Sequence, residues 1–395
     1  MDMREHFDVV VVGGGPAGAT AAHELARRGR TVLLLDRAGR IKPCGGAIPP
    51  RLIRDFDIPA HLLVARINAA RMISPKGRRV DIPIEGGFVG MVDREIFDEF
   101  LRARAEAAGA VRRCGTFTSF SRDAQGLALL AYRAAGEDAL TQVAANSVIG
   151  ADGALSAVAR QAVPNAGRPK YVFAYHEIVR APVAAENYDA RRCDVVYRGA
   201  ISPDFYGWVF PHGATASVGT GTSQKGFSLR AATAALREAN GLGGAQTIRM
   251  EGAPIPLRPL KRWDNGRDVV LAGDAAGVVA PASGEGIYYA MLGGRLAGDA
   301  VEQMLATGDA SALKSARRRF MKAHGRVFWI LGVMQYFWYG SDKRREAFVK
   351  ICADRDVQKL TFDAYMNKEL QRRDPMAHVR IFFKDLAHLF GFARA

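Results

Sequence analysis

The hydrophobic pattern of the chain opens with two short apolar runs that flank a helical segment. Phe7 to Val12 and Thr31 to Leu35 are continuous apolar runs, and Pro16 to Arg28 between them has helical composition. Strands buried on both faces of a parallel sheet have continuous apolar runs, whereas half-exposed strands alternate. The pattern therefore predicts a β-α-β unit with buried parallel strands at the start of the chain.

Later segments extend this unit. The pattern predicts a helix over Arg94 to Ala108 and a strand over Val143 to Gly150 that ends in a Gly-rich turn. Another apolar strand, Val269 to Ala272, is followed by a Gly-rich turn and a helix from about Glu285 to Leu305. We expect the chain to leave the first sheet and return to it.

A different pattern occupies the middle of the chain. Short runs such as Asp194 to Tyr197, Gly207 to Phe210 and Ala216 to Thr220 are typical of an antiparallel sheet. Residues 39 to 90 are rich in Gly and Pro, which indicates loops and the start of an inserted region. We expect a parallel-sheet domain over residues 1–60, 90–165 and 260–310. An inserted domain is expected over residues 61–89 and 166–259, and a helical basic region over residues 311–395.

Composition excludes several classes of protein. The 395 residues are 49% apolar and can form a large core. The 4 cysteines are far apart and form no C-x-x-C pair, so we expect neither a metal site nor a disulfide framework, and a reducing compartment. They are Cys44, Cys114, Cys193 and Cys352. Charged residues precede the first apolar run and leave no room for a signal or transit peptide, so we expect a cytoplasmic protein.

Basic residues are in excess, and most of the excess lies near the C-terminus. The net charge is +15, and residues 311–395 hold 18 Lys and Arg against 8 Asp and Glu. This asymmetry indicates an anionic partner. The longest apolar stretch, Val327 to Trp338, is shorter than the roughly 20 residues that span a bilayer. We therefore expect no transmembrane helix.

The C-terminal region has two interpretations. The clusters Arg317 to Arg319 and Lys343 to Arg345 are typical of solvated helix faces. Near the chain end, apolar side chains recur at helical spacing among basic ones: Val379, Phe382, Phe383, Leu386, Leu389 and Phe390. Such an amphipathic helix either lies on an anionic membrane or packs against the core of the protein itself.

The turn after the first strand carries a candidate dinucleotide motif. The motif runs from Gly13 through Gly15 to Gly18, and Asp36 ends the next strand. The glycines let the backbone approach a pyrophosphate, the helix N-terminus supplies N–H donors, and the carboxylate accepts from a ribose hydroxyl. Strand, helix and acid together indicate a dinucleotide site, but the motif does not separate FAD from NAD(P).

Two later motifs resemble the FAD motifs of the flavoprotein hydroxylase and geranylgeranyl reductase superfamily. One is Gly150-Ala151-Asp152-Gly153, and the other is Gly273-Asp274-Ala275-Ala276-Gly277, followed by Gly284-Glu285-Gly286. The resemblance implies that FAD contacts Asp152, Gly153, Asp274, Gly277, Gly284 and Gly286. Asp274 ends a strand, where it can accept from ribitol hydroxyls, and a helix starting near Gly286 would point its positive end at the flavin.

Three further stretches are similar to the geranylgeranyl reductase family, in its chlorophyll and bacteriochlorophyll branch. Lys42 to Pro49 looks like the Cys-Gly-Gly segment of that family. Ser202 to Pro211, with Gly219 to Gly221 downstream, looks like its Y-x-W-x-F-P motif, and Phe348 to Leu370 is similar to its C-terminal segment. The resemblance implies an enzyme that saturates three of the four double bonds of a geranylgeranyl chain, on the pigment or as the diphosphate, to give phytyl.

The residues of these stretches are compatible with that chemistry. Tyr206, Trp208 and Phe210 alternate and so share one face of a strand, either as a wall for a long polyene or as ordinary sheet core. An isolated alkene has no carbonyl to receive charge, so hydride from flavin N5 requires a proton donor. Cys44 is either that donor, a flavin gate or an inert thiol, and Tyr206 and His212 are further candidates.

These observations favour an α/β protein. We expect a glutathione-reductase-like FAD-binding Rossmann domain, an inserted antiparallel-sheet substrate domain and a helical C-terminus. No second G-x-G-x-x-G follows a strand, so NADPH or reduced ferredoxin is expected to dock transiently as electron donor. We expect no nucleic-acid partner. The composition favours a bacterial protein. With the family resemblance, this implies a protein that acts on bacteriochlorophyll at the cytoplasmic face of photosynthetic membranes.

Three other functions fit the same residues. An aromatic-ring monooxygenase on this scaffold would require O₂ and a phenolic substrate. A reductase of archaeal-type membrane lipids would act on a different isoprenoid. A flavin-binding assembly factor of the pigment apparatus would bind FAD without substrate turnover.

Overall fold

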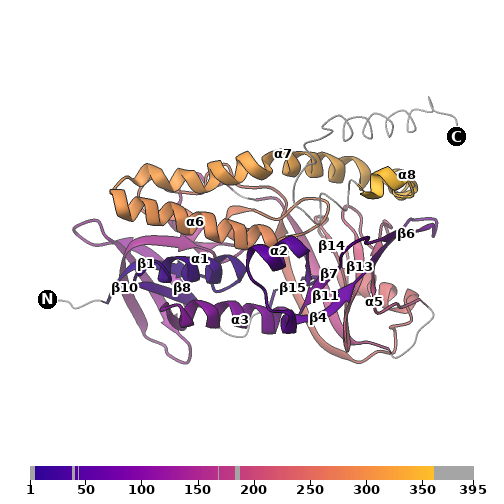
Figure 1. Ribbon diagram of the computed structural model, residues 1–395, viewed down its shortest axis with the longest axis horizontal. Coiled ribbons are helices and arrows are strands. Elements are labelled where there is room, and N and C mark those ends of the chain that lie inside the picture. Colours follow the sequence, from indigo (N-terminus) through magenta and orange to yellow (C-terminus); the bar gives the residue numbers. More distant parts are fainter. Residues whose placement is uncertain (1–4, 38–40, 43, 168, 183–186, 360–395) are drawn as a thin grey trace. The chain divides into compact units, whose positions relative to one another are not determined.

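The computed structural model describes residues 5–37, 41–42, 44–167, 169–182 and 187–359 (Figure 1). The chain divides into two compact units. Unit 1 comprises Met1–Ile41, Glu95–Tyr171 and Pro254–Gly332, and unit 2 comprises Lys42–Arg94, Val172–Ala253 and Val333–Ala395. Relative to the expected division, the boundaries assign residues 42–60 and the chain from Val333 onward to unit 2.

Unit 1 contains a six-stranded sheet. Its strands are β1 (His6–Val12), β2 (Val32–Asp36), β8 (Val111–Arg122), β9 (Ala128–Ala134), β10 (Leu140–Gly150) and β16 (Val269–Leu271). Five of them run parallel in the order β8-β2-β1-β10-β16, and β9 pairs antiparallel with β8 and β10. Val12 lies beside Leu35 and Gly150, and Gly150 beside Leu271. The carboxyl ends of four strands are therefore level with one another.

Helices of unit 1 pack closely because their contact residues are small. They are α1 (Pro16–Ala26), α3 (Arg94–Ala107), α4 (Ala157–Ala162), η2 (Gly273–Ala276), α6 (Ile287–Thr307), η3 (Ala310–Leu313) and the first part of α7 (Lys314–Trp338). A Cβ on Gly294 of α6 would lie 2.1 Å from the Ala17 carbonyl oxygen of α1, so only glycine permits this approach. Helix α7 runs beside α6 (Figure 1), and the rings of Tyr289 and Phe328 are 4.9 Å apart.

Unit 2 contains a seven-stranded sheet in the order β15-β11-β14-β13-β12-β5-β6. Their bounds, in that order, are Thr247–Pro256, Tyr171–Arg180, Thr215–Thr222, Gly207–His212, Arg192–Val196, Ala69–Ile73 and Arg79–Pro83. One face packs on α5 (Leu229–Ala239) through Val209, Val218 and Leu236. On the other face, Cys193 and Phe210 pack against Met91 of a small second sheet.

The small sheet and the remaining short helices complete unit 2. The sheet has the order β3-β7-β4, with bounds Ala47–Ile48, Val89–Val92 and Leu63–Ile67. The helices are α2 (Pro50–Asp55), η1 (Ala60–Leu62) and α8 (Asp342–Ile351). Among the described residues, the stretch from 39 to 92 thus contains five strands where the sequence indicated loops and the start of an inserted region. These strands have two to five residues each, so Gly and Pro in the connecting turns dominate the local composition.

The α/β fold with a Rossmann-like domain and a largely antiparallel second sheet confirms the predicted fold class. The β-α-β unit lies at His6–Asp36, and the returning strand and helix are β16 and α6. No helix within the described ranges is both long and apolar enough to cross a membrane. The amphipathic segment predicted between Val379 and Phe390 lies outside the described residues.

Candidate functional site

The Gly-rich turn after β1 has two kinds of glycine. Gly13 has φ +105°, and a Cβ on it would lie 2.3 Å from the Ala151 carbonyl oxygen. A Cβ on Gly18 would lie 1.8 Å from the Gly13 carbonyl oxygen. Gly15 is different, because a Cβ there would have no atom within 4 Å. Gly15 is also the N-cap of α1, so open space lies beside the N-terminus of a helix, a place that commonly binds phosphate groups in proteins.

Asp36 lies against the same turn. A Cβ on Gly14 would be 2.7 Å from the Asp36 Cγ atom, which shows how closely the carboxylate approaches the glycines. Arg102 of α3 donates to the Gly14 carbonyl oxygen at 3.3 Å and to Asp36 Oδ2 at 3.4 Å. The guanidinium therefore holds the acid and the turn together. Nothing in the sequence distinguishes Arg102 from the many other arginines on predicted helices.

The Asp152 carboxylate accepts hydrogen bonds from the N-terminus of α4. Its Oδ1 atom accepts from Ser156 Oγ at 2.5 Å, and its Oδ2 accepts from the backbone N–H groups of Ala157 and Val158 at 2.6 and 3.1 Å. Burial raises the pKa of Asp152. The adjacent Gly153 has open space on its Cβ side. Both residues follow β10 at the aligned strand ends, but Gly153 is the one with room for a ligand.

Asp274 lies at the start of η2, directly after β16. The N-cap of α6 is Gly286, and a Cβ built there would be 4.0 Å from Asp274 Oδ1. The start of α6 and the Asp274 carboxylate are thus neighbours. Gly277 ends η2, and Gly284 lies in the turn that leads to α6. The aligned strands place Asp36 and the turns that contain Gly15, Gly153 and Asp274 at one edge of the unit 1 sheet.

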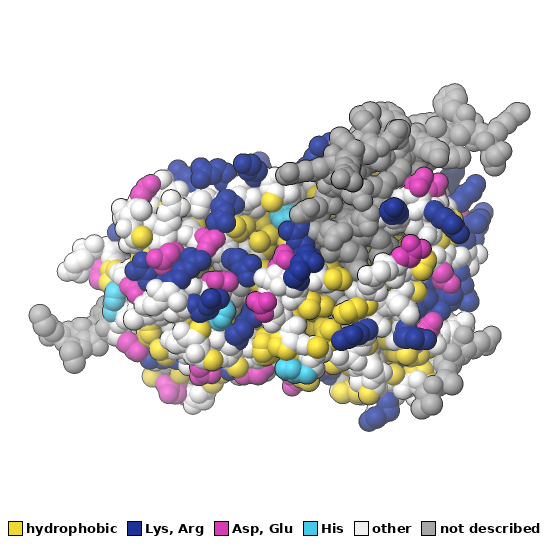
Figure 2. Space-filling view, in the orientation of Figure 1, with side chains coloured by type: hydrophobic (Ala, Val, Ile, Leu, Met, Phe, Trp, Pro, Cys, Tyr) yellow, Lys and Arg dark blue, Asp and Glu magenta, His cyan; other side chains and the backbone are white. Residues whose placement is uncertain are grey.

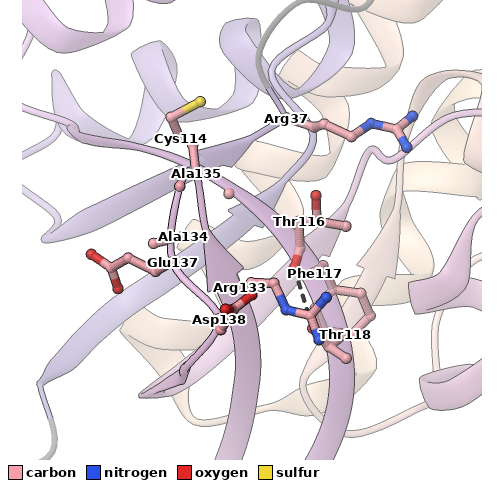
Figure 3. A pocket seen from close by; sticks show the side chains of 12 residues that line it. Arg37, Cys114, Thr116, Phe117, Thr118, Arg133, Ala134, Ala135, Glu137 and Asp138 are labelled. Atoms are coloured by element: carbon pink, nitrogen blue, oxygen red, sulfur yellow. Dashed lines mark hydrogen bonds between the residues drawn. The ribbon is translucent and has the colours of Figure 1, made fainter.

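A cavity of about 640 Å³ lies next to the carboxyl end of β2 (Figure 3). Its walls come from β8, the turn between β9 and β10, and Arg37, the residue after Asp36. Among the lining residues are Cys114, Thr116 and Arg133. Its volume falls in the range of small-molecule sites. The sequence did not indicate this cavity, because its walls meet only when β8 pairs with β2 and β9.

The rings of Tyr206, Trp208 and Phe210 form a row along one segment of unit 2. The Tyr206 and Trp208 ring centroids are 6.2 Å apart, and those of Trp208 and Phe210 are 6.5 Å apart. Tyr206 and Trp208 are buried, and Phe210 is half-buried. The three rings share one face, opposite to the face that packs on α5.

The Cys-Gly-Gly loop lies directly on this aromatic strand. A Cβ on Gly45 would be 2.6 Å from the Phe210 ring, and one on Gly46 would be 2.4 Å from His212 Nε2. The Gly46 N–H also donates to Cys44 Sγ at 3.3 Å. Two motifs that are more than 150 residues apart in the sequence are therefore in contact, and the glycines make that contact possible.

His212 is a buried, neutral imidazole. Its Nδ1 lies 3.0 Å from the Phe210 carbonyl oxygen, to which the Nδ1–H donates. Burial lowers the pKa of His212 to about 4. At neutral pH the ring therefore carries its single proton on Nδ1 and presents the Nε2 lone pair to the Cys-Gly-Gly loop.

Arg345 anchors the motif that precedes β13. Its guanidinium donates to the Pro203 carbonyl oxygen, to the Tyr339 carbonyl oxygen at 2.5 Å and to Asp342 at 2.6 Å. Asp342 in turn accepts from the Gly199 N–H at 2.8 Å. Arg345 is only 3% exposed. The interpretation of the cluster Lys343 to Arg345 as a solvated helix face is therefore wrong for Arg345.

Known families match most of the chain. A model described as an NAD(P)-binding Rossmann-like domain matches residues 11–73, and one described as an FAD binding domain matches residues 65–323. A geranylgeranyl diphosphate reductase of Rhodobacter capsulatus is 60% identical over 98% of both chains. The chloroplastic geranylgeranyl diphosphate reductase of Oryza sativa is 38% identical over 94% of this chain and 84% of its own length.

Solved structures share the fold. A geranylgeranyl bacteriochlorophyll reductase-like protein from Thermoplasma acidophilum superposes with a TM-score of 0.79. It is 23% identical in sequence, and the match covers 93% of this chain and 98% of the other.

Proposed function

The chain belongs to the geranylgeranyl reductase family, and we propose that it is an FAD-dependent enzyme that saturates three double bonds of a geranylgeranyl chain to give phytyl. The observation that carries this proposal is the contact between the Cys-Gly-Gly loop and the aromatic strand, in a chain that matches such reductases over nearly its whole length. We propose bacteriochlorophyll as the carrier of the geranylgeranyl chain, with the free diphosphate as the alternative substrate.

The aligned turns of unit 1 fit FAD. The open space at Gly15 and the N-terminus of α1 would receive the pyrophosphate, and Asp36, held by Arg102, would bind a ribose hydroxyl. Asp274 and the N-terminus of α6 would face the flavin side of the cofactor. Bound there, FAD supplies the hydride that the reduction requires.

The proton must come from the chain or from water that it admits, because an isolated alkene cannot stabilise negative charge. His212 lacks a proton on Nε2 at neutral pH and so accepts rather than donates there. We therefore propose Cys44 as the donor, with Tyr206 as the alternative. In Cys44→Ser, reoxidation of reduced flavin by substrate should slow by roughly 10²-fold, measured by anaerobic rapid mixing. Unchanged reoxidation would move the role to Tyr206.

Turnover under anaerobic conditions tests the proposed function. Reduced enzyme is mixed with geranylgeranyl-bacteriochlorophyll or geranylgeranyl diphosphate, and mass spectrometry then measures gains of two, four and six hydrogens. The substrate that reaches six identifies the natural carrier. No gain with either substrate would overturn the proposal, and oxygen uptake stimulated by phenols would indicate a monooxygenase instead.

The electron donor is proposed to be NADPH or reduced ferredoxin, docked transiently. The sequence offers no second Gly-rich dinucleotide motif after a strand, and the net charge of +15 suits either anionic donor. Anaerobic bleaching of the flavin by each donor separately distinguishes them.

We also propose that the enzyme contacts the membrane surface. Lys322, Arg326, Trp329 and Tyr336 recur at helical spacing on α7, and Trp329 and Tyr336 are 69% and 84% exposed. Figure 2 shows basic side chains along the edge where α7 runs in Figure 1. Exposed Trp and Tyr beside Lys and Arg suit the interface of an anionic bilayer. Such contact would give the enzyme access to a lipid-soluble substrate.

A further inference from the structure

A row of buried polar side chains crosses the unit 2 sheet beside Trp208. The Trp208 Nε1–H donates to Ser217 Oγ at 3.0 Å, and the same oxygen lies 2.9 Å from His176 Nδ1. His176 Nε2 contacts Glu251 Oε2. These four residues come from the neighbouring strands β13, β14, β11 and β15, so the row follows the order of the sheet.

The row is shielded from solvent, since Ser217, His176 and Trp208 are 0%, 2% and 4% exposed. Buried polar atoms require partners. One arrangement of protons satisfies every group: Trp208 donates to Ser217, Ser217 donates to Nδ1 of His176, and Nε2–H of His176 donates to Glu251. The direction of each hydrogen bond then depends on His176.

Gly219 provides the space for this arrangement. It lies opposite both Trp208 and His176 in the sheet. A Cβ on Gly219 would be 2.4 Å from Trp208 Cζ2 and 2.5 Å from His176 Cβ. The indole therefore lies over Gly219 of β14, where only glycine leaves room, and its Nε1–H reaches the hydroxyl of Ser217 on the same strand.

The far end of the row is fixed by ion pairs. Glu251 Oε1 lies 2.9 Å from Arg249 Nε, and Arg249 Nη2 lies 3.1 Å from both Asp93 carboxylate oxygens. Glu251 is thus held on one side by Arg249 and meets His176 on the other. The orientation of the His176 ring is set by this anchored carboxylate rather than by solvent.

We propose that His176 is a positioning residue that locks the Trp208 indole through Ser217 and thereby sets how far the isoprenoid chain is reduced. The inference rests on the proposed function and on Trp208 forming part of the wall that binds the isoprenoid chain. Each reduction replaces a planar alkene by a flexible saturated unit, so later substrates depend more on a fixed wall to align the next double bond. A loosened indole should let partly reduced chains leave before the third reduction.

Variants of the full-length, FAD-loaded enzyme test this inference. Two substrates are compared: the geranylgeranyl chain, and the same chain after two double bonds have been reduced (the tetrahydro substrate). The measured quantity is kcat/KM for the tetrahydro substrate divided by kcat/KM for the geranylgeranyl substrate. Ser217→Ala removes the hydroxyl, and His176→Gln removes the Nδ1 acceptor of that hydroxyl. Each variant should lower this ratio about tenfold. His176→Asn keeps an acceptor close to the Nδ1 position and should retain most of the ratio. In a Trp208→Phe background, Ser217→Ala should have little further effect.

A matched control separates positioning from folding. Ser147 is also fully buried, and its hydroxyl donates to the Asp268 carbonyl oxygen at 2.9 Å in unit 1. Ser147→Ala should lower stability without changing the product ratio. If Ser217→Ala and His176→Gln behave in the same way as this control, the role is structural and the inference is overturned.

Tryptophan emission distinguishes the two ways of failing. Loss of the hydrogen bond to the indole should shift the emission in Ser217→Ala, and this shift should be absent in the Trp208→Phe background. If wild-type enzyme reduces no geranylgeranyl chain, the proposed function fails and the inferred control of product length fails with it. If wild-type enzyme is active and the emission shifts while the ratio stays constant, only the inference fails.

Discussion

Gly46 lies so close to His212 that a single added carbon would displace the imidazole. A Cβ on Gly46 would be 2.4 Å from His212 Nε2 and 2.5 Å from the Val92 carbonyl oxygen, and the residue has φ +68°. The Cys-Gly-Gly loop is therefore held in register with the aromatic strand by the absence of a side chain. Cys44 lies two residues before Gly46 in the same loop, and its Sγ accepts from the Gly46 N–H at 3.3 Å.

Gly46→Ala should abolish turnover while FAD remains bound, because the loop must move away from His212. Gly86→Ala is the matched control, since Gly86 also has φ +68° but open space around its Cβ position. Both variants should lose about 1 kcal/mol from the unfavourable backbone conformation. Full activity in Gly46→Ala would show that the close contact has no functional role.

Gly15→Val should prevent FAD binding without unfolding the protein. Its backbone has φ −72°, which valine can adopt, and the new side chain would enter the open space at the start of α1. Absorbance at the flavin bands and thermal unfolding of the apoprotein measure the two effects. Gly244→Val, another site with no atom within 4 Å, should leave the flavin bound. A yellow Gly15→Val protein with one FAD per chain would contradict the assigned pyrophosphate site.

His212 should make stability depend on pH between about 4 and 6.5. Its pKa in the folded protein, about 4, is lower than the ordinary value of 6.5. In this window the unfolded chain binds a proton that the folded chain does not, so stability is complete above pH 6.5 and falls as the pH drops toward 4. The size of the effect is on the order of 3 kcal/mol. Denaturant unfolding of wild type and His212→Gln at pH 4.5 and 7 should show a smaller loss in the variant.

Arg345→Met should destabilise the protein by about 3 kcal/mol, because the carbonyl oxygens of Pro203 and Tyr339 would lose their buried donor. Lys343→Met, on the exposed side of the same helix, should change stability by less than about 0.5 kcal/mol. Thermal unfolding compares the two variants, and hydrogen exchange around Pro203 shows whether the loop loosens. Equal stability of both variants would mean that Arg345 does not anchor the motif.

Trp329→Ser combined with Tyr336→Ser should release the protein from anionic liposomes, and binding of the wild type should weaken with added salt. The control pair Ile248→Ser and Met250→Ser removes apolar side chains that are 50% and 53% exposed on β15. Sedimentation with phosphatidylserine vesicles measures the difference. Deleting residues 376–395 tests the contribution of the chain end separately. Equal sedimentation of both double variants would exclude α7 as the contact.

Local patterns in the sequence were sufficient to predict much of unit 1. Continuous apolar runs identified β1 and β2 to within one residue at each end, and the glycines after Val12 marked the turn into α1. These features are local, because a buried parallel strand needs an unbroken apolar run and a tight strand-to-helix turn needs glycine. The aromatic alternation at Tyr206, Trp208 and Phe210 was predictable for the same reason.

Contacts between distant segments depend on the tertiary structure. Arg102 meets Asp36 only because the fold brings a residue of α3 to the end of β2, and Gly46 meets His212 only because two segments of unit 2 pack together. Ser217 and His176 carried no signal at all, since a serine and a histidine on separate strands become a hydrogen-bonded row only when the strands align. The sequence alone determined which turns have the glycines that a dinucleotide site requires, because that requirement acts on neighbouring residues. Strand register and packing decided which side chains hold Asp36 and Trp208 in place, because these partners are brought together only by the folded sheets.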